Sequence, residues 1–435
     1  MAIDILTAND RQGDYPASYY AATATPLPAF DGAKGALRAD VCIVGAGFTG
    51  LSAALHLAQA GYDVALLDAH RVGFGASGRN GGQVGMGQRL GQDELEDMVG
   101  KDHARALWDL SLEAVALVRN LIDTHKMDCG WTPGIIGADH RARYVPHTHA
   151  YVDKLNTEYG YDQIRKLERE ELRALVGSPA YHGGALDMGG GHLHPMRYVI
   201  GLARACAAAG VRIYENTKVT GVTQGAPAKV TTANAVISAD HVLLACNGYL
   251  GGLDEQVAAR VMPINNFIVA TEPLDEDTAR GLIRDNLAVA DSKFVINYFR
   301  LSEDRRMLFG GTESYGYKFP PDIAALVRRP MTQIYPQLRD VRIDYAWGGT
   351  LGITMNRMPH FARLHGNILS ASGYSGHGVA MATLGGKVAA LAMQGQAERF
   401  DLMADVPTRR FPGGVALRAP LLVAAMLWYS LRDRF

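Results

Sequence analysis

The sequence has few cysteines, no excess of charge of either sign and no long apolar run. Its 435 residues include four cysteines, none of them in CxxC spacing: Cys42, Cys129, Cys206 and Cys246. This pattern argues against a disulfide framework and fits a reducing compartment, so we expect a cytoplasmic protein without a metal site. The formal net charge of −1 gives no electrostatic case for binding nucleic acid or an acidic membrane.

No run approaches the roughly 18 apolar residues that a membrane-spanning helix needs. The nearest candidate is 421–429, which we expect to pack as a terminal helix or, less favoured, to dock on a surface or partner. The first ten residues lack a basic segment and a long apolar core, so we expect no signal peptide. The sequence gives no indication of the oligomeric state.

A glycine-rich segment near the N-terminus predicts a dinucleotide-binding unit. An apolar run at 41–44 is typical of a buried parallel strand, and GAGFTG (45–50) follows it. Apolar residues at helical spacing predict a helix over 51–60, and a second apolar run at 64–67 ends in Asp68. A chance glycine-rich turn would not have strand, helix, second strand and acid in this order.

Each residue type in this unit has a physical role. Gly45 permits the tight turn, Gly47 lets the backbone approach a pyrophosphate, and Gly50 lets the helix pack against the strand. The helix N-terminus offers free N–H groups and positive dipole to the phosphates. Asp68, at the carboxyl end of its strand, can accept a hydrogen bond from a ribose hydroxyl.

The rest of the chain places βα units on both sides of a region rich in short strands. We expect helices over 103–123, 148–159, 167–176, 195–209 and 379–393, and a flexible break at 189–191. Strands are expected at 211–215, 218–223, 228–232, 241–246, 264–271, 294–301, 306–311, 341–347 and 367–371. This order predicts an α/β fold (α+β overall), with a Rossmann-type domain and an inserted mixed or antiparallel-sheet substrate domain.

Five segments in this order carry a family resemblance. They are the fingerprint at 45–50, GFGASGRNGGQ at 73–83, WGG at 347–349, RMP at 357–359 and GYSGHG at 373–378. The chain resembles the D-amino-acid oxidase/glycine oxidase superfamily of FAD-dependent amine oxidoreductases. SYYAA at 18–22, GGGHLHP at 189–195 and YSLRDR at 429–434 make it similar to the gamma-glutamylputrescine oxidoreductase branch. The resemblance covers nearly the whole chain. It is more specific for the superfamily than for one substrate, because close relatives oxidise different amines.

The resemblance implies FAD, with its ADP half on the Rossmann unit and its isoalloxazine between two domains. The FAD-binding domain is then expected over 1–100, 190–255 and 350–435, and the substrate domain over 101–189 and 256–349. Relatives with covalent FAD attach it to a His after the second strand or a Cys after the Trp-x-Gly region. Residues 73–84 contain no His and 347–359 no Cys, so we expect noncovalent FAD. No second GxGxxG unit for NAD(P)H is present, which favours reduction of the flavin directly by substrate.

The resemblance also assigns residues to the cofactor. Arg79 is expected to pair with phosphate or face the flavin ring, the alternative being a solvent-exposed loop arginine. Asn247 and Gly248 are expected on the adenosine side, or in a plain turn. The full set is Gly45, Gly47, Phe48, Thr49, Gly50, Asp68, Ala69, Gly75, Ala76, Ser77, Gly78, Arg79, Asn80, Gly81, Gly82, Val219, Asn247, Gly248, Gly373, Gly376, His377, Gly378 and Val379.

Four residues are candidates for the catalytic site. His377 precedes a helix whose N-terminus would stabilise negative charge on the flavin, and its imidazole either takes part in catalysis or only caps and packs. Trp347, Tyr298 and Tyr374 are candidates for an aromatic box around an amine, with ordinary core packing as the alternative. Glu313 either binds an ammonium group or is an exposed carboxylate.

One departure from the family pattern bears on the substrate. Glycine-oxidase-type relatives carry an arginine shortly after Trp-x-Gly that grips the α-carboxylate, but 348–352 contain none. The nearest, Arg357, resembles a structural position of the family. We therefore expect no recognition of a carboxylate next to the reacting carbon, which favours a primary amine such as a substituted putrescine.

The expected reaction is FAD-dependent oxidation of a gamma-glutamylputrescine-like amine to an imine and then an aldehyde, with ammonia and hydrogen peroxide released. The alternatives are an oxidase or dehydrogenase of another secondary amine or an amino acid, using dioxygen or another acceptor. Lys318 is the one lysine near the 306–318 hairpin that could promote reaction with oxygen. A flavin-binding sensor without turnover is the rival outside enzymes.

Overall fold

The computed structural model describes residues 4–413, and within this range the strands form two sheets. In the first sheet, β17, β10, β1, β2 and β7 run parallel, and β16, β8 and β9 are added antiparallel. Its strands are β1 (Gly35–Val44), β2 (Val64–Leu67), β7 (Arg212–Tyr214), β8 (Val219–Thr223), β9 (Ala228–Thr232), β10 (Ala235–Leu244), β16 (His360–His365) and β17 (Ile368–Ser372).

The second sheet is mixed and mainly antiparallel, in the order β15-β11-β14-β13-β12-β4-β6-β3, with β5 paired to β6. Its strands are β3 (Gln83–Val84), β4 (Thr132–Ala138), β5 (Ile164–Leu167), β6 (Gly184–His192), β11 (Met262–Thr271), β12 (Ala288–Asp291), β13 (Tyr298–Leu301), β14 (Met307–Ser314) and β15 (Ile343–Ile353). The expected fold class, α/β with a second, largely antiparallel sheet, is confirmed.

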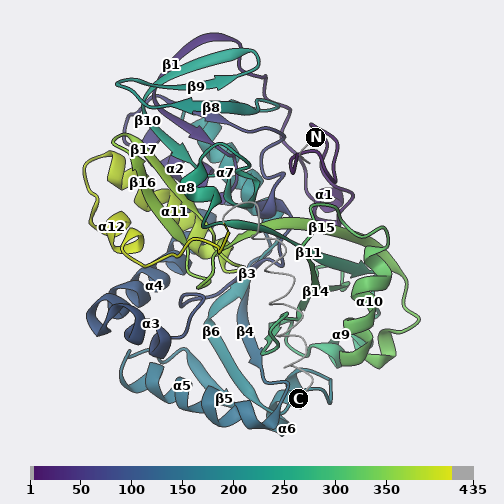
Figure 1. The fold of residues 1–435 in the computed structure, drawn as a ribbon. Coiled ribbons are helices and arrows are strands. Elements are labelled where there is room, and N and C mark those ends of the chain that lie inside the picture. The colour runs from purple at the N-terminus through teal and green to yellow at the C-terminus, as the bar shows by residue number, and fades with distance from the viewer. Residues whose placement is uncertain (1–3, 414–435) are drawn as a thin grey trace.

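The helices cover the two sheets separately (Figure 1). α2, α7, α11 and α4 pack on one another beside the first sheet, and α10 packs on β11, β14 and β15 of the second. The helices are α1 (Tyr19–Thr23), α2 (Phe48–Gln59), α3 (Gln92–Val99), α4 (Lys101–Thr124), α5 (Val145–Thr157), α6 (Arg169–Leu175), α7 (Pro195–Ala208), α8 (Glu255–Ala258), α9 (Glu276–Leu282), α10 (Ile323–Ile334), α11 (Gly378–Met393) and α12 (Glu398–Ala404).

The first βαβ unit forms as the sequence predicts. Val41 to Val44 are buried because β1 lies between two parallel neighbours and is covered on both faces. The strand starts earlier than expected, at Gly35, and α2 starts at Phe48 rather than at residue 51. The second strand matches the predicted bounds, 64–67.

The predicted flexible break at 189–191 is wrong, because these glycines lie inside β6. A Cβ on Gly190 would come within 2.7 Å of the carbonyl oxygen of Val84, and one on Gly191 within 2.4 Å of that of Thr132. The glycines therefore allow β3 and β4 to approach β6 closely, and they do not interrupt the strand.

The division into two domains stays a prediction, but the sheets show where its boundaries differ from the structure. β3, inside the segment 1–100, pairs with β6 of the second sheet. α4, inside 101–189, packs on α11, which follows the last strand of the first sheet. β6 and β15 each continue across an expected boundary, at 189/190 and 349/350.

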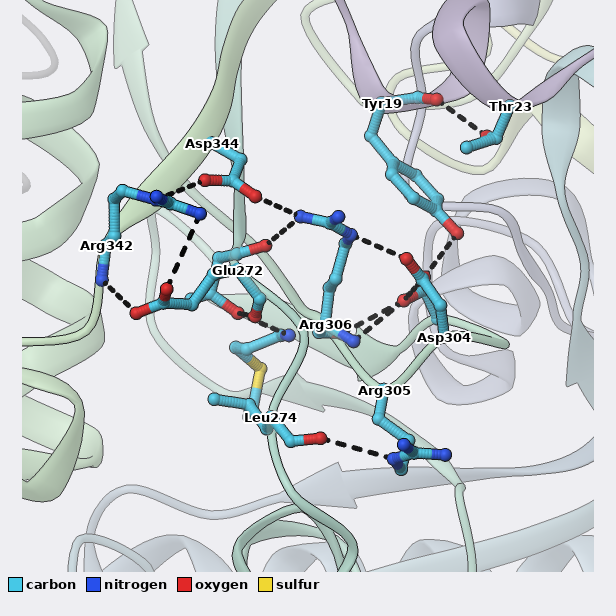
Figure 2. Close-up of polar contacts among 12 residues, drawn as sticks. Tyr19, Thr23, Glu272, Leu274, Asp304, Arg305, Arg306, Arg342 and Asp344 are labelled. Carbon is cyan, nitrogen blue, oxygen red and sulfur yellow. Dashed lines mark hydrogen bonds and ion pairs between the residues drawn. The ribbon is translucent and has the colours of Figure 1, made fainter.

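The N-terminal arm is tied to the second sheet through Tyr19. Its hydroxyl donates to Asp304 Oδ1 at 2.8 Å, in the turn between β13 and β14 (Figure 2). Arg306 donates from Nε to Asp304 and from Nη1 to Asp344, both at 2.6 Å, so the same network reaches β15. Tyr20 is fully buried beside Trp347. These contacts fix the arm across strands that are far from it in sequence.

No helix within residues 4–413 combines the length and apolar character needed to cross a membrane. The terminal helix expected over 421–429 lies outside the described residues.

Candidate active site

A cavity of about 950 Å³ is lined by residues of both sheets. This volume is at the upper end of the range of small-molecule sites. One part of the wall contains the glycine-rich turns after β1 and β2 and the residues around β8 and the end of β10. Another part contains residues of β6, β11, β13 and β14, including Asp187, Asn266, Tyr298 and Glu313. The cavity therefore offers room for an extended cofactor and a separate reacting molecule.

The turn after β1 has the geometry predicted for its glycines. Gly45 has a φ of +109°, and a Cβ there would lie 2.7 Å from the carbonyl oxygen of Ala245. A Cβ on Gly50 would lie only 1.8 Å from the carbonyl oxygen of Gly45. These positions require glycine because any side chain would displace the helix from the strand.

Asp68 stands directly after β2, on the cavity wall, as predicted. Oδ2 accepts from the backbone N–H of Ala46 at 2.7 Å, and Oδ1 accepts from that of His70 at 2.8 Å. Burial raises the pKa of Asp68 to about 6, although the two backbone hydrogen bonds oppose this. A carboxylate oxygen accepts more than one hydrogen bond, so both oxygens keep capacity toward a ribose.

The second glycine-rich segment packs against the N-terminus of α2. Ser77 Oγ accepts from the N–H of Phe48 at 3.0 Å, and a Cβ on Gly47 would lie 2.8 Å from the same oxygen. Asn80 Oδ1 accepts from the N–H of Gly82 at 2.8 Å and so shapes the following turn. The two segments thus form one backbone-rich surface on the cavity wall.

Arg79 is buried, so the alternative of an exposed loop arginine is wrong. Nε donates to the carbonyl of Phe74 at 2.7 Å, and Nη1 donates to Asp10 at 3.0 Å and to the carbonyl of Gly348 at 3.1 Å. Nη2 has no hydrogen-bond partner among the described residues. The phosphate or flavin role of Arg79 stays a prediction.

Asn247 links the ends of two strands. It follows β10 at a positive φ, and its Oδ1 accepts from the N–H of Gly373, directly after β17, at 2.9 Å. Gly248 acts through its backbone, since a Cβ there would lie 2.8 Å from the carbonyl oxygen of Leu351. The segment lies in a short 3₁₀ turn, and Asn247 itself faces the cavity.

Most residues assigned to the cofactor line the cavity. Those on its wall are Gly45, Gly47, Phe48, Thr49, Asp68, Ala69, Gly75, Ala76, Ser77, Arg79, Asn80, Gly81, Gly82, Val219, Asn247, Gly376, His377, Gly378 and Val379. Gly50, Gly78, Gly248 and Gly373 are not on the wall and support it through close backbone packing.

His377 lies on the cavity wall immediately before α11. Its side chain makes no capping hydrogen bond, so the capping alternative is wrong. Nε2 is buried and has no partner among the described residues. Burial, together with the nearby charge of Arg89, lowers the pKa of His377 to about 4, which leaves the imidazole neutral at pH 7. Hydrogen bonds with the backbone of Gly85 and Gly87 oppose this fall in pKa, so part of the ring is held by protein groups.

Tyr298 also lines the cavity, held between two glycines. A Cβ on Gly81 would lie 2.7 Å from its ring, and one on Gly310 would lie 2.2 Å from it. Its hydroxyl donates a short hydrogen bond to Asn266 Oδ1. Burial raises the pKa of Tyr298 well above its ordinary value, so the phenol keeps its proton.

The structure does not assemble the expected aromatic box. Trp347 is buried outside the cavity wall, with Nε1 donating to the carbonyl of Arg79 at 3.0 Å and its ring edge-on to Tyr20. It packs in the core because the N-terminal arm covers its side of β15. Tyr374 borders the cavity, but its hydroxyl is engaged with Thr49 Oγ1 at 2.7 Å. Of the three aromatics, Tyr298 is the one in position to face a substrate.

The cavity contains charged residues that sequence reasoning missed or placed elsewhere. Arg89 and Asp187 were not foreseen, and Arg357 lies on the wall although it was expected to be structural. Glu313 is half-buried and lines the cavity, so the expectation of an exposed carboxylate is wrong. Lys318 is exposed and is not among the lining residues. No local motif marks Arg89 or Asp187, because each reaches the cavity through the packing of distant strands.

Comparison with known proteins agrees with this geometry. The model of the family described as FAD dependent oxidoreductase matches residues 40–392. The chain belongs to this family. It is 43% identical over 419 residues to a Rhizobium meliloti protein named Probable oxidoreductase OrdL, covering 96% of this chain and 97% of the other. It is 41% identical over 423 residues to the gamma-glutamylputrescine oxidoreductase of Escherichia coli, covering 97% and 99%.

The fold is shared with solved enzymes of low sequence identity. Glycine oxidase from Geobacillus kaustophilus superposes with a TM-score of 0.73 at 20% identity, covering 85% of this chain and 99% of that one. The chain is therefore an FAD-dependent oxidoreductase with amine and amino-acid oxidases among its relatives. The glycine turn, Asp68 and the cavity volume fit a dinucleotide cofactor.

Proposed function

We propose that this protein oxidises a gamma-glutamylputrescine-like primary amine. The observation that carries the proposal is the 41% identity to gamma-glutamylputrescine oxidoreductase over nearly the full length of both chains. In the proposed reaction, the amine, one dioxygen and one water give an aldehyde, ammonia and hydrogen peroxide. Bound FAD supplies the two-electron acceptor, and we propose that it is held without a covalent link.

The cavity walls supply what an amine substrate requires. A free alkylamine has a pKa near that of lysine, about 10, and must lose a proton before its C–H bond can be oxidised. Apolar residues such as Ile268 and Ile296 line the cavity, and desolvation there favours the neutral amine. The base is not assigned by the residues present, since both His377 and Asp187 face the cavity.

We propose that His377 orients the amine. Its imidazole lies on the cavity wall and is neutral at pH 7, which is suited to a hydrogen bond with the substrate nitrogen. The ring of Tyr298 forms an adjacent wall, and its hydroxyl is held by Asn266. These groups position the amine and exclude water, and the imidazole of His377 forms the hydrogen bond to the amine nitrogen.

The proposal is tested by anaerobic stopped-flow reduction of the enzyme-bound flavin. The panel contains polyamines, their γ-glutamyl conjugates and α-amino acids. Gamma-glutamylputrescine is expected to reduce the flavin faster than glycine, sarcosine or D-alanine, by about tenfold or more in the ratio of limiting rate to Kd. Faster reduction by D-alanine or sarcosine would contradict the proposed substrate class. Absence of reduction by every amine would favour a flavin-binding sensor.

A second candidate is an oxidase or dehydrogenase of a carboxylate-bearing amine, because two of the three arginines on the cavity wall, Arg89 and Arg357, have no ion-pair partner within residues 4–413. The yield of peroxide per amine consumed distinguishes an oxidase from an enzyme that uses another acceptor. The cytoplasmic location expected from the sequence stays a prediction.

A further inference from the structure

We propose that Arg89, Arg357 and Glu313 form a subsite for an α-amino-acid headgroup that is remote from the reacting amine. The arginines would bind the α-carboxylate, and Glu313 the α-ammonium group. In gamma-glutamylputrescine, these groups lie at the opposite end from the primary amine. The inference rests on the proposed function, which it extends to the basis of substrate choice.

The two arginines lack the partners that buried arginines have elsewhere in this protein. Arg79 donates to Asp10 and two carbonyls, and Arg300 donates to the carbonyls of Gly81 and Leu193. Within residues 4–413, neither guanidinium of the pair Arg89 and Arg357 makes a hydrogen bond or an ion pair. Both are half-buried on the cavity wall. Buried charges are normally paired, so this arrangement is suited to an anionic ligand.

Arg89 and Arg357 line the same cavity, so one bound ligand would meet both. Burial lowers the pKa of Arg89, and the positive charge of Arg357 adds to this effect, so the two guanidinium groups repel each other. Arg357 also lies 5.7 Å from the ring centroid of Phe294, another lining residue. A carboxylate between the guanidinium groups would relieve the repulsion and use their planar donors.

Glu313 supplies the opposite charge without neutralising the arginines. It lines the same cavity, and its Oε2 accepts from the hydroxyl of Tyr315 at 3.3 Å. No ion pair joins it to Arg89 or Arg357 in the described part of the chain. Burial raises the pKa of Glu313, while the two arginines oppose the rise. The wall thus presents both signs of charge separately, which complements a zwitterion.

The subsite lies toward the proposed catalytic residues. Glu313 is paired across the sheet with Asn266, which accepts from Tyr298, and the charge of Arg89 acts on His377. We therefore place the headgroup at the charged cluster and the amine near His377, within this one cavity. Asp187 is a less suitable partner for the headgroup, because its Oδ1 already accepts from Tyr161 at 2.6 Å and from the N–H of Gly189 at 3.0 Å.

The test compares the wild type with Arg89→Met, Arg357→Met, the double variant and Glu313→Gln. Stopped-flow reduction gives Kd and the limiting rate for gamma-glutamylputrescine and for putrescine, which lacks the headgroup. Each arginine variant is expected to raise Kd for gamma-glutamylputrescine on the order of tenfold, with the limiting rate and the putrescine values little changed. Equal losses for both substrates, or no change for either, would overturn the subsite.

Two controls keep the result interpretable. Arg329→Met makes the same change at an exposed position of α10 and is expected to leave both Kd values unchanged. Flavin occupancy and Tm are measured for every variant, so that a loss of folding is recognised. Arg89→Lys, which keeps the positive charge, is expected to recover part of the affinity for gamma-glutamylputrescine that Arg89→Met loses.

A third ligand separates this inference from the proposed function. γ-Glutamylbutylamide keeps the headgroup but lacks the terminal primary amine of the putrescine part, and its binding is followed by perturbation of the flavin spectrum. Binding to the wild type that is lost in the double variant supports the subsite even if no amine reduces the flavin. Failure of the wild type to bind it overturns the subsite, whatever amine the enzyme oxidises.

Discussion

Asp68 Oδ2 accepts a hydrogen bond of 2.7 Å from the backbone N–H of Ala46, the residue between the first two glycines of the turn after β1. The acid at the end of β2 therefore holds the glycine turn in place from the neighbouring strand. The same carboxylate faces the cavity. A residue chosen from the sequence for cofactor binding thus has a second, structural contact.

Replacing Asp68 with Ala is expected to weaken FAD binding. Loss of a charge-assisted hydrogen bond costs about 1.5–3 kcal/mol, and the N–H groups of Ala46 and His70 lose their acceptor. FAD titration of the apoprotein measures the affinity, and Asp68→Asn, which keeps one acceptor oxygen, serves as the matched variant. The reduction rate of the FAD-loaded fraction is expected to stay near the wild-type value; a large rate loss at full occupancy would contradict the assignment.

His377 is expected to make the stability of the apoprotein pH-dependent. Its folded-state pKa of about 4 is below the unfolded value of 6.5, so the unfolded chain binds more protons between these values. The contribution of His377 to the free energy of unfolding is therefore fully present above pH 6.5. It is lost as the pH falls toward 4, by about 3 kcal/mol. Denaturant unfolding of wild type and His377→Gln at pH 7 and pH 4.5 measures the difference. If the wild type lost no more free energy of unfolding than His377→Gln between pH 7 and pH 4.5, the imidazole would be solvated in the folded protein.

Gly81→Ala is expected to displace the Tyr298 ring. The added Cβ would lie 2.7 Å from two ring carbons, which is closer than real contacts allow. Overpacking of this kind costs about 1–3 kcal/mol, and we expect slower flavin reduction as well as a lower Tm. Gly366→Ala is the matched control, since nothing lies within 4 Å of a Cβ built there. Equal Tm and equal rates in the two variants would exclude a tight Gly81–Tyr298 contact.

Acid or heat precipitation is expected to release FAD into the supernatant. The motivation is the absence of His in 73–84 and of Cys in 347–359. Absorbance of the supernatant and of the washed pellet measures the distribution. Flavin that stays with the precipitated polypeptide would refute noncovalent binding.

Local patterns were sufficient to predict the first βαβ unit and the residues around it. Gly45, Gly50 and Asp68 are specified by a turn, a close packing contact and a strand end, all within one short segment. Trp347 was misplaced because the motif that contains it does not reveal that Tyr20 covers its side of β15. Arg89 and Arg357 line one cavity only after both sheets have formed, so no spacing along the chain could reveal that they share it. The gathering of unpaired charges on one cavity wall is a property of the tertiary structure alone.

The order of strands in the first sheet has a consequence for biosynthesis. β1 emerges early from the ribosome, but its neighbour β10 ends at Leu244, and β17, which pairs with β10, ends at Ser372. At translation rates of about 5–20 residues per second, β1 waits on the order of 20 to 60 seconds for the sheet to be completed. Its apolar residues must be shielded during this interval, and the cofactor can be loaded only when most of the chain has been synthesised.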